Sequence, residues 1–425
     1  MKTVLLVSPR FPPLNAPDHQ RVRMMIPNLR RLGWDPVVLA LRTEPELGAQ
    51  EPELAAALDG QARIERAVPL PLALARLAGF SSLGARGFLA LRRAGARLIR
   101  ETRPAVAFFS TTEFLTWPLA RLWQKRLALP YVLDWQDPWV SRYYEEHPAV
   151  PPPGGRLKYG LSQVLAGAFE PGVARNAAHH VTVSRAYGDA LRDRYGAIAP
   201  VTEIPFAASL DDFALAARQP AVMPAPRPRY WLCAGRGGAD LEFSLTCLFK
   251  AFANARAGNP GRWSDLALWF VGTSYAPAGR EHGTIAALAA RCGVSDQVVE
   301  TPQRVGYLEA LRLMRGAEAL LVPGSDDAAY NPSKLMTCVT SGQPVLGILH
   351  ARSPAHARAA ELPGAVLVPF AREAGEGAVI EALQRRWFDV DRANLAATQP
   401  RAVPGFEAAG MTARLAAIFD EVAAA

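Results

Sequence analysis

The chain has 425 residues, of which half are apolar and a fifth are charged. This length exceeds the size at which a single core keeps growing, so we expect two domains of about 200 residues each, and the composition excludes a disordered chain. The net charge of +8 lies in the first half, because residues 1–210 hold 26 Lys and Arg against 18 Asp and Glu, and the remainder holds 21 of each.

The first half of the chain opens with a pattern typical of a βαβ unit. A buried strand over residues 4–8 is followed by a proline-rich loop, and apolar residues then recur at helical spacing over residues 22–32. Gly33 stands where such a helix would end, and residues 37–41 form a second apolar strand. This order predicts a parallel sheet with right-handed crossovers. The alternation continues with strands at 105–109, 131–133 and 181–183 and with helices over 115–127 and up to Arg175.

Residues 76–100 combine positive charge with apolar side chains, because six arginines alternate there with leucine and phenylalanine. Such a segment can lie on anionic lipid, where each cation near the surface contributes about 1 kcal/mol. An ordinary core helix with a solvated arginine face gives the same pattern. We expect no nucleic-acid binding, since no recognised motif accompanies the charge.

A second α/β series follows a proline-rich segment. Residues 217–229 carry four prolines and predict an extended linker. We therefore expect a first domain of residues 1–216, a second domain of residues 230–404 and a C-terminal helix within 405–425, with packing against the first domain as one option for that helix. The expected strands of the second domain are 230–234, 266–271, 298–300, 319–322, 345–349 and 365–368, and the expected helices include 245–257, 284–292, 307–315, 333–341 and, in the tail, 406–422.

The cysteines, histidines and apolar runs exclude several classes of protein. Four cysteines lie far apart, and the seven histidines form no H-E-x-x-H motif, which favours buried thiols in a reducing cytosol and no metal site. No apolar run reaches the roughly 18 residues that a membrane span needs. The apolar stretch at the N-terminus is too short for a signal peptide, so we expect a cytoplasmic protein.

Six fragments stand at predicted strand ends, where doubly wound sheets bind their ligands. In order and spacing they resemble glycosyltransferase family 4, whose members have the GT-B fold, and the resemblance covers nearly the whole chain. The fragments are VLLVSPRFPPLNAPDHQRVRMM (4–25), YVLDWQDPWV (131–140), FEPGVARNAAHHVTVSRAYGDALRDRYG (169–196), CAGRGG (233–238), WFVGTS (269–274) and YNPSKLMTCVTSGQPVLGIL (330–349).

The resemblance implies an α/β protein with two doubly wound, Rossmann-like domains facing a central cleft. A nucleotide-sugar donor would lie on the second domain, and a saccharide, lipid-linked or small-molecule acceptor would enter against the first. Transfer would be retaining and metal-independent, with no cofactor beside the nucleoside-diphosphate sugar, in the synthesis of a cell-surface polysaccharide or glycolipid. Members that act on lipid-linked acceptors dock on membranes, which suggests peripheral contact with the inner face of the cell membrane through residues 76–100.

The sequence departs from the family at its pair of glutamates, which stand eight residues apart. Counting back from Gly342, the two positions hold Ala329 and Thr337. In the family the second glutamate binds the donor ribose and the first lies near the donor sugar. The loss leaves three options, namely a different donor, ribose recognition by Ser325, Asp326 or Asp327, or a non-catalytic member.

The donor-side candidates follow strands of the second domain. Gly235, Arg236 and Gly237 offer close backbone approach and a forked cation that matches phosphate geometry. Ser333 and Lys334 begin a helix whose free N–H groups attract an anion. A flexible loop, an ordinary Asn-Pro helix start and a solvated turn are the structural alternatives. The resemblance adds Gly272, Thr273, Arg304, Val305, Asp326 and Asp327 as donor contacts.

The acceptor-side candidates follow strands of the first domain. Carboxylates and aromatic rings at a strand end suit a polyol acceptor, although a structural carboxylate or a helix cap explains them equally. Glu113 stands where the family often has a catalytic histidine, and Glu170 is expected to pair with an arginine. The candidate catalytic residues are Asp137, Glu113 and His19, and the other acceptor-side candidates are Asn15, Asp18, Asp134 and Trp135.

Three hypotheses of function follow from these observations. The leading one is a retaining transferase that uses a nucleoside-diphosphate sugar. A non-catalytic relative that binds or assembles partners in the same pathway is the alternative, because both glutamates are missing. The third is an inverting GT-B enzyme with Asp137 or Glu113 as its base.

Overall fold

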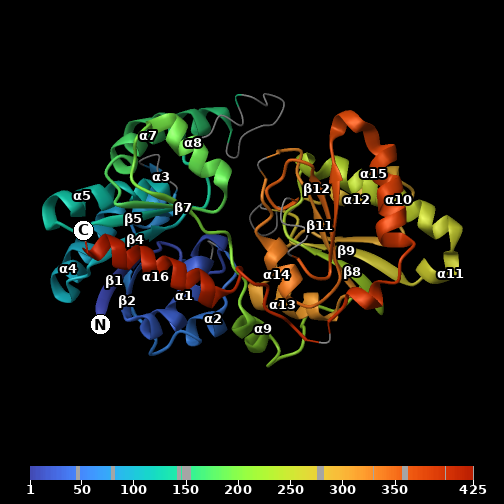
Figure 1. Ribbon diagram of the computed structural model, residues 1–425, viewed down its shortest axis with the longest axis horizontal. Coiled ribbons are helices and arrows are strands. Elements are labelled where there is room, and N and C mark those ends of the chain that lie inside the picture. Colours follow the sequence, from blue (N-terminus) through green and yellow to red (C-terminus); the bar gives the residue numbers. More distant parts are fainter. Residues whose placement is uncertain are drawn as a thin grey trace. The chain divides into compact units, whose positions relative to one another are not determined.

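The computed structural model divides the chain into two compact units (Figure 1). The first unit comprises Met1–Pro205 and Ala408–Ala425, and the second comprises Phe206–Glu407. The structure describes residues 1–44, 48–77, 82–140, 145, 155–274, 282–328, 330–356, 362–397 and 399–424.

The first unit is built on a seven-stranded parallel sheet with the order β3-β2-β1-β4-β5-β6-β7. From β1 the chain adds β2 and β3 on one side and then β4 to β7 on the other, so the strand order reverses between β1 and β4. Leu5 of β1 pairs with Val37 of β2 on one side and with Ala107 of β4 on the other. In such sheets the crevice at this switch point binds ligands. The strands are β1 (Lys2–Val7), β2 (Trp34–Leu41), β3 (Arg63–Ala67), β4 (Val106–Ser110), β5 (Tyr131–Trp135), β6 (His179–Thr182) and β7 (Val201–Glu203).

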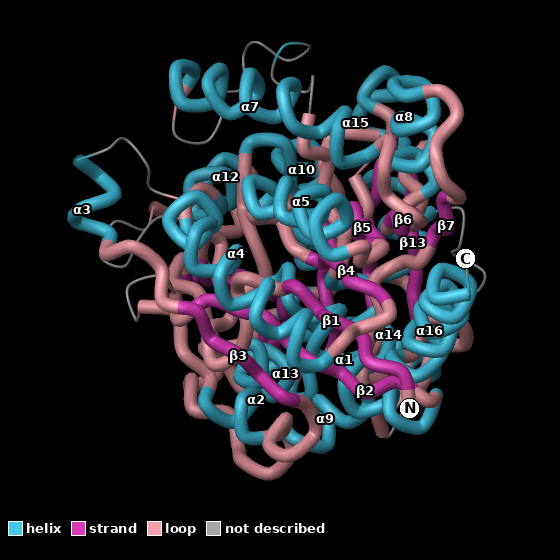
Figure 2. The backbone as a smooth tube through the Cα atoms, turned by 90° about the vertical axis from the view of Figure 1, so that its left-hand side faces the viewer, coloured by secondary structure: helices cyan, strands magenta, loops and turns pink. Residues whose placement is uncertain are grey.

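Helices cover both faces of this sheet (Figure 2). On one face, apolar residues of α4 and α5 pack on alternate residues of the strands, in a core that includes Leu91, Leu119 and Phe109. On the other face, α16 packs against α1, and Phe419 of α16 contacts Trp34 and Phe108 at ring-centroid distances of 5.7 and 5.4 Å. The helices are α1 (Gln20–Leu29), α2 (Pro52–Ala56), α3 (Leu72–Leu77), α4 (Leu83–Thr102), α5 (Pro118–Leu127), α7 (Arg156–Ala174), α8 (Arg185–Tyr195) and α16 (Ala408–Ala424).

The second unit repeats the same winding in a six-stranded parallel sheet with the order β10-β9-β8-β11-β12-β13. Its core gathers tryptophan and phenylalanine rings around Trp231, and its switch point lies between β8 and β11. The strands are β8 (Arg229–Ala234), β9 (Leu266–Val271), β10 (Val298–Thr301), β11 (Ala319–Pro323), β12 (Val345–His350) and β13 (Ala365–Phe370). The helices are α9 (Leu210–Ala216), α10 (Glu242–Gly258), α11 (Pro260–Trp263), α12 (Ile285–Arg291), α13 (Tyr307–Gly316), α14 (Lys334–Thr340) and α15 (Gly375–Leu383).

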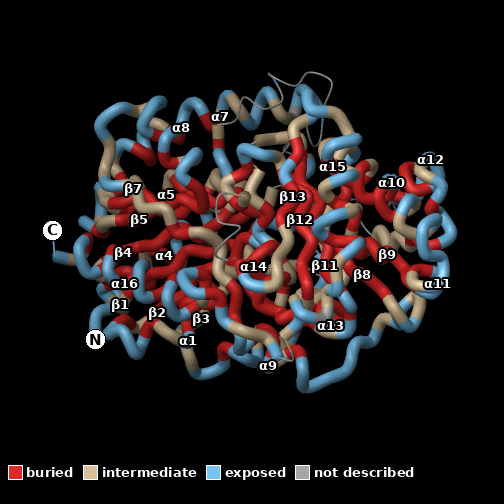
Figure 3. Tube along the Cα trace, turned by 45° about the vertical axis from the view of Figure 1, so that its right-hand side comes forward, coloured by how far each residue is buried: buried red, intermediate tan, exposed pale blue. Residues whose placement is uncertain are grey.

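The prediction of two doubly wound α/β domains is confirmed, and every predicted strand is present within a few residues. The sequence did not reveal β3 and β7, whose residues are polar and only half buried because both are edge strands. Figure 3 shows how burial concentrates on the central strands of both sheets. None of the described helices is long and apolar enough to cross a membrane.

The boundary between the units differs from the expected one. The first unit ends at Pro205, not at 216, and residues 206–229 group with the second unit. Two contacts explain this grouping. Asp212 of α9 accepts a hydrogen bond from the Tyr307 hydroxyl (2.9 Å), and Glu309 accepts from the backbone N–H groups of Val222 and Met223 (2.8 Å each). The expected linker is therefore fastened to the second unit.

Candidate functional site

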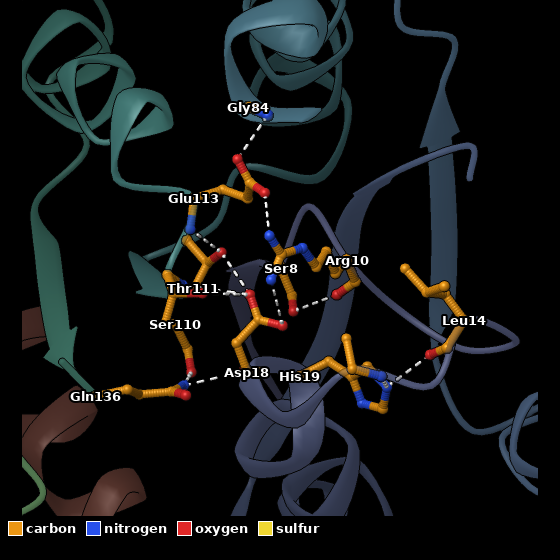
Figure 4. Close-up of polar contacts among 12 residues, drawn as sticks. Ser8, Arg10, Leu14, Asp18, His19, Gly84, Ser110, Thr111, Glu113 and Gln136 are labelled. Carbon is orange, nitrogen blue, oxygen red and sulfur yellow. Dashed lines mark hydrogen bonds and ion pairs between the residues drawn. The ribbon is translucent and has the colours of Figure 1, made fainter. Parts of the chain in front are cut away.

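In the first unit, Asp18 joins the two loops that flank the switch point (Figure 4). It follows β1 in a short 3-10 turn, Pro17–His19, and its side chain is buried. Its Oδ2 atom accepts hydrogen bonds from the Thr111 hydroxyl (3.1 Å) and from the backbone N–H of Thr112 (3.3 Å), which follow β4. The Oδ1 atom lies 3.8 Å from Nη1 of Arg10. Asp18, which was predicted to contact the sugar acceptor, thus connects the two loops.

Glu113, on the loop after β4, is also held on both sides. One carboxylate oxygen pairs with Nη2 of Arg10, and the other accepts a hydrogen bond from the backbone N–H of Gly84 (2.8 Å) at the start of α4. A Cβ atom at position 84 would lie 2.9 Å from that oxygen, so this helix start needs glycine. With both oxygens engaged, Glu113 is better placed to fasten α4 than to remove a proton.

Asp134 and Trp135, predicted to face the acceptor, lie inside the first unit. The Asp134 carboxylate is completely buried and accepts a hydrogen bond from Ser110 (2.7 Å) beside the Arg21 guanidinium, whose Nε lies 2.9 Å away. Trp135 donates from Nε1 to Nδ1 of His180 (3.0 Å). Successive side chains of β5 point to opposite faces of the sheet, and both are buried because helices cover both faces, so neither side chain lines the site.

His19 is buried and neutral. Its Nε2–H donates to the carbonyl of Leu14 (2.8 Å), and the ring contacts Phe11 edge to face. Burial, reinforced by the positive charge of Arg23, lowers the pKa of His19 to about 4. Among the described residues its Nδ1 atom has no hydrogen-bond partner. His19 therefore offers a neutral acceptor nitrogen, but inside the protein.

Asp137 is the candidate on this side that keeps access to solvent. It follows Gln136, whose side-chain amide donates to the carbonyl of Asp18 (2.9 Å) and to the Ser110 hydroxyl (2.9 Å). Desolvation by the surrounding protein and the negative charge of Asp18 raise the pKa of Asp137 to about 6. A carboxyl group with this pKa can take up and release a proton near neutral pH. Asn15, also predicted here, is half buried and is tied to Ala49 by its backbone N–H (2.9 Å).

In the second unit, the predicted Lys334 reaches the loop after β8. Its Nζ atom lies 3.3 Å from Sγ of Cys233, the one hydrogen-bond partner that this ammonium has among the described residues. Gly235 has a φ of 142°, and a Cβ atom there would lie 3.2 Å from Nζ of Lys334. The glycine therefore makes room for the lysine. The ammonium is only partly satisfied, beside the switch point where a doubly wound sheet binds its ligand.

Arg236 does not extend freely from the same loop. Its Nη1 and Nη2 atoms donate to the two oxygens of Asp240 at 2.8 and 2.6 Å, and its guanidinium lies 5.3 Å from the Tyr330 ring centroid. Tyr330 and Asp326 both belong to the loop after β11, and Asp326 donates its backbone N–H to the Asp240 carbonyl (2.9 Å). The loops after β8 and β11 are thus joined around Arg236, as the switch-point geometry predicts.

A carboxylate that the sequence did not single out, Glu300, orders the next loop. It lies in β10 and accepts hydrogen bonds from the Thr273 hydroxyl (2.6 Å) and from the backbone N–H groups of Ile285 and Ala286 (2.9 Å each) at the start of α12. Thr273 in turn accepts a hydrogen bond from the Gly237 N–H through its carbonyl (2.8 Å). A glutamate near the end of a strand gives no sequence signal for this role, because its partners come from other segments of the chain.

The remaining donor-side candidates surround these loops. Gly272 has a φ of 75°, and a Cβ atom there would lie 3.7 Å from the Cα of Arg304, so its loop approaches Arg304. Arg304 is exposed and Val305 is half buried. Asp326 pairs with Arg372 (2.9 Å), and the backbone N–H of Asp327 donates to Ser325 (3.1 Å). Ser333 precedes α14 and makes no side-chain cap. Thr337 is buried, and the Ala329 position lies outside the described residues.

Comparison with known proteins found one family match and several similar folds. Residues 19–207 match the model of the glycosyl transferase 4-like domain. Sucrose-phosphate synthase from Thermosynechococcus elongatus is similar in structure, with 16% identity and a TM-score of 0.58 over 100% of this chain and 97% of that chain. An α,α-trehalose 6-phosphate synthase from Burkholderia multivorans is similar at 13% identity and a TM-score of 0.59, over 99% and 95% of the two chains.

A third similar structure is the HepE protein of Anabaena in complex with UDP-glucose, with 13% identity and a TM-score of 0.55 over 100% of this chain and 99% of that chain. These identities establish a shared fold. No curated protein sequence matches this chain.

Proposed function

We propose that this chain, a GT-B protein whose residues 19–207 form a glycosyl transferase 4-like domain, transfers a sugar from a nucleoside-diphosphate sugar to a saccharide or lipid-linked acceptor. The domain match supports glycosyl transfer as the reaction. The similar fold of a protein solved with UDP-glucose supports a nucleotide-sugar as the donor. The reaction serves the synthesis of a cell-surface polysaccharide or glycolipid in the cytoplasm, a compartment with which four free cysteines are consistent.

The observation that carries the proposal is the partly satisfied ammonium of Lys334 at the switch point of the second unit. It lies beside Gly235 with a thiol as its partner, and a diphosphate oxygen is a far stronger acceptor for it than sulfur. Arg236 stands on the same loop and would share the charge of the diphosphate. Two protein cations can neutralise the leaving group, so the proposal needs no metal ion and no cofactor.

Retention of the anomeric configuration is proposed from the family resemblance. The missing glutamates are then replaced by polar groups of the loop after β11. Asp326 keeps one carboxylate oxygen without a hydrogen-bond partner among the described residues, and Asp327 is half buried beside it. These carboxylates are the candidates to bind the donor ribose in place of a glutamate at position 337.

For the acceptor, Asp137 is the group that the geometry favours. It keeps access to solvent, and its pKa of about 6 suits a residue that orients or deprotonates a hydroxyl group. Residues 76–100, proposed for contact with anionic membrane, divide into two sets. Arg86 is buried against Glu44 and Arg97 pairs with Glu65. The other four arginines of the stretch are exposed and are the part that we propose for contact with lipid, namely Arg76, Arg92, Arg93 and Arg100.

A non-catalytic binding role is the alternative, favoured by the buried Thr337 at the position of the second glutamate. Incubation of the purified protein with UDP-, GDP-, ADP- and TDP-sugars separates the two functions. We expect release of the nucleoside diphosphate from one donor, by transfer or slow hydrolysis, and its loss in Lys334→Ala. NMR of the product anomer then distinguishes retention from inversion. A donor that binds with no turnover under any of these conditions would favour the alternative.

A further inference from the structure

Helix α7 presents an apolar stripe to solvent. Leu157, Leu161 and Val164 are 93%, 61% and 69% exposed, and Ala168 is exposed as well. Their spacing of four, three and four residues places them on one side of the helix. Figure 3 colours most of this helix pale blue. Soluble surfaces carry single exposed leucines without consequence, but a continuous stripe marks an interaction site.

The stripe is not the side of α7 that packs against the protein core, because the helix buries a different side. Its buried residues, Ala166, Glu170, Val173 and Ala174, lie on the opposite side of the helix from the stripe. Glu170 fixes that side, accepting hydrogen bonds from Arg194 (2.6 Å), from the Tyr195 hydroxyl (2.5 Å) and from the backbone N–H of Val140 (2.8 Å). The helix therefore cannot turn its stripe inward without breaking these contacts.

The charged residues that flank the stripe in the sequence are basic. From residue 155 to residue 169 the only charged residues are Arg156 and Lys158, with no acidic residue among them. The whole excess charge of the chain lies in its first half. A second copy of this chain would meet the stripe with the same positive charge, whereas an anionic bilayer offers both opposite charge and an apolar interior.

The position of the stripe in the sheet agrees with a lipid surface. Helix α7 runs from the carboxyl end of β5 back to the start of β6, so Leu157 and Leu161 lie toward the edge that holds Asp137. The segment that follows the carboxyl end of β3 at the same edge also carries exposed apolar residues, Val68, Leu70 and Leu74. An acceptor anchored in lipid would reach the strand ends from this edge.

We propose that the α7 stripe, defined as Leu157, Leu161, Val164 and Ala168, inserts into the interfacial region of an anionic lipid bilayer and docks the first unit on it. The stripe supplies apolar contact and the basic residues of the first half supply attraction to lipid headgroups. This docking does not depend on sugar transfer, and it assigns the main membrane contact to α7, with residues 76–100 adding charge alone.

Co-sedimentation of the full chain with lipid vesicles tests the proposal without donor or acceptor. We expect binding to vesicles of phosphatidylcholine mixed with phosphatidylglycerol, and much weaker binding to phosphatidylcholine alone. Leu157→Glu should weaken the partition coefficient by about tenfold or more. Val222→Glu is the matched control, because Val222 is also highly exposed (82%) but lies in the second unit, and it should leave binding unchanged. Circular dichroism checks that both variants are folded.

Three outcomes would overturn the proposal. The first is equal binding of Leu157→Glu and the unaltered chain to anionic vesicles. The second is loss of binding in the double variant Arg92→Glu and Arg93→Glu with none in Leu157→Glu, which would assign docking to α4. The third is a dimer in sedimentation equilibrium that Leu157→Glu dissociates without any vesicle binding, which would make the stripe an interface between copies.

Discussion

The carboxylates at the strand ends of the first unit differ in what surrounds them, and that difference separates structural from chemical residues. Asp18, Glu113 and Asp134 are buried and engaged by backbone, hydroxyl or guanidinium groups. Asp137 alone among the four keeps access to solvent. In the sequence all four are equally acidic residues after apolar strands, because side-chain partners from distant loops leave no local pattern.

Replacement of Glu113 by alanine should therefore lower stability. The change leaves the Gly84 N–H without its acceptor and the Arg10 guanidinium without its counter-ion, so we expect a loss of about 2 kcal/mol in the free energy of unfolding. Glu113→Gln, which keeps an acceptor oxygen, should lose less. Urea denaturation measures both. A stable Glu113→Ala protein without transfer activity would instead make Glu113 catalytic.

The pH dependence of stability tests the environment of Asp137. Its pKa is raised to about 6 from an ordinary value of 3.8, so the folded chain holds this proton more tightly than the unfolded chain does. The stability that this provides is present below pH 4 and is lost as the pH rises through about 6. We therefore compare the free energies of unfolding of Asp137→Asn and of the unaltered chain, each relative to its own value at pH 4. The difference between them should grow in favour of the variant up to about pH 6 and then stay constant.

His19 titrates in the opposite sense over the same range, since burial lowers its pKa to about 4. Its contribution to stability is lost as the pH falls below about 6.5, so the comparison must be made against the variant and not from one pH profile alone. Parallel profiles of variant and unaltered chain would contradict a raised pKa at Asp137.

At the scale of elements, the apolar strands and amphipathic helices could be predicted, whereas the edge strands and the caps could not. Strand β9 is a continuous apolar run that is buried throughout, which period analysis detects. Strand β3 has the sequence Arg-Ile-Glu-Arg-Ala and borders solvent, so nothing in its composition distinguishes it from a loop. The role of Glu300 could not be predicted for a similar reason. This residue caps α12 from β10, and the two elements are brought together only in the folded chain.

Removal of the Glu300 carboxylate should disturb the donor loop as well as the helix start. Glu300→Ala leaves the Ile285 and Ala286 N–H groups without their acceptor and releases Thr273, and we expect a loss of about 2 kcal/mol together with weaker nucleotide binding. Glu376→Ala, which removes a partly exposed carboxylate paired with Lys250, should change stability by less than about 1 kcal/mol. Equal effects of the two changes in urea denaturation would show that Glu300 is not a cap.

At the scale of the whole molecule, both units share one winding order, and the chain passes between them twice, at Pro205 and at Glu407. The alternation of strands and helices was sufficient to predict two doubly wound sheets. The first boundary was placed too late because the prolines of residues 217–229 predict a linker, while the contacts of Asp212 and Glu309 that fasten this segment come from residues far along the chain.

The return of α16 to the first unit makes a separate prediction. Phe419 packs on Trp34 and Phe108, so Phe419→Ala should cost about 3 to 4 kcal/mol in the unfolding of the first unit. The second unit has its own tryptophan-rich core, and its unfolding should be unaffected. Calorimetry with limited proteolysis of each unit resolves the two transitions. A shift of both transitions by the same amount would show that the units do not unfold separately.

The central claim is that the second unit binds the diphosphate of a nucleotide-sugar through Lys334 and Arg236. Isothermal titration calorimetry with UDP, GDP, ADP and TDP measures this directly and does not depend on turnover. We predict saturable binding of at least one nucleoside diphosphate at a single site, weakened about tenfold or more by Lys334→Ala or Arg236→Ala and unchanged by Val222→Glu. The absence of binding by all four nucleotides at millimolar concentration, or binding that both substitutions leave intact, would contradict it.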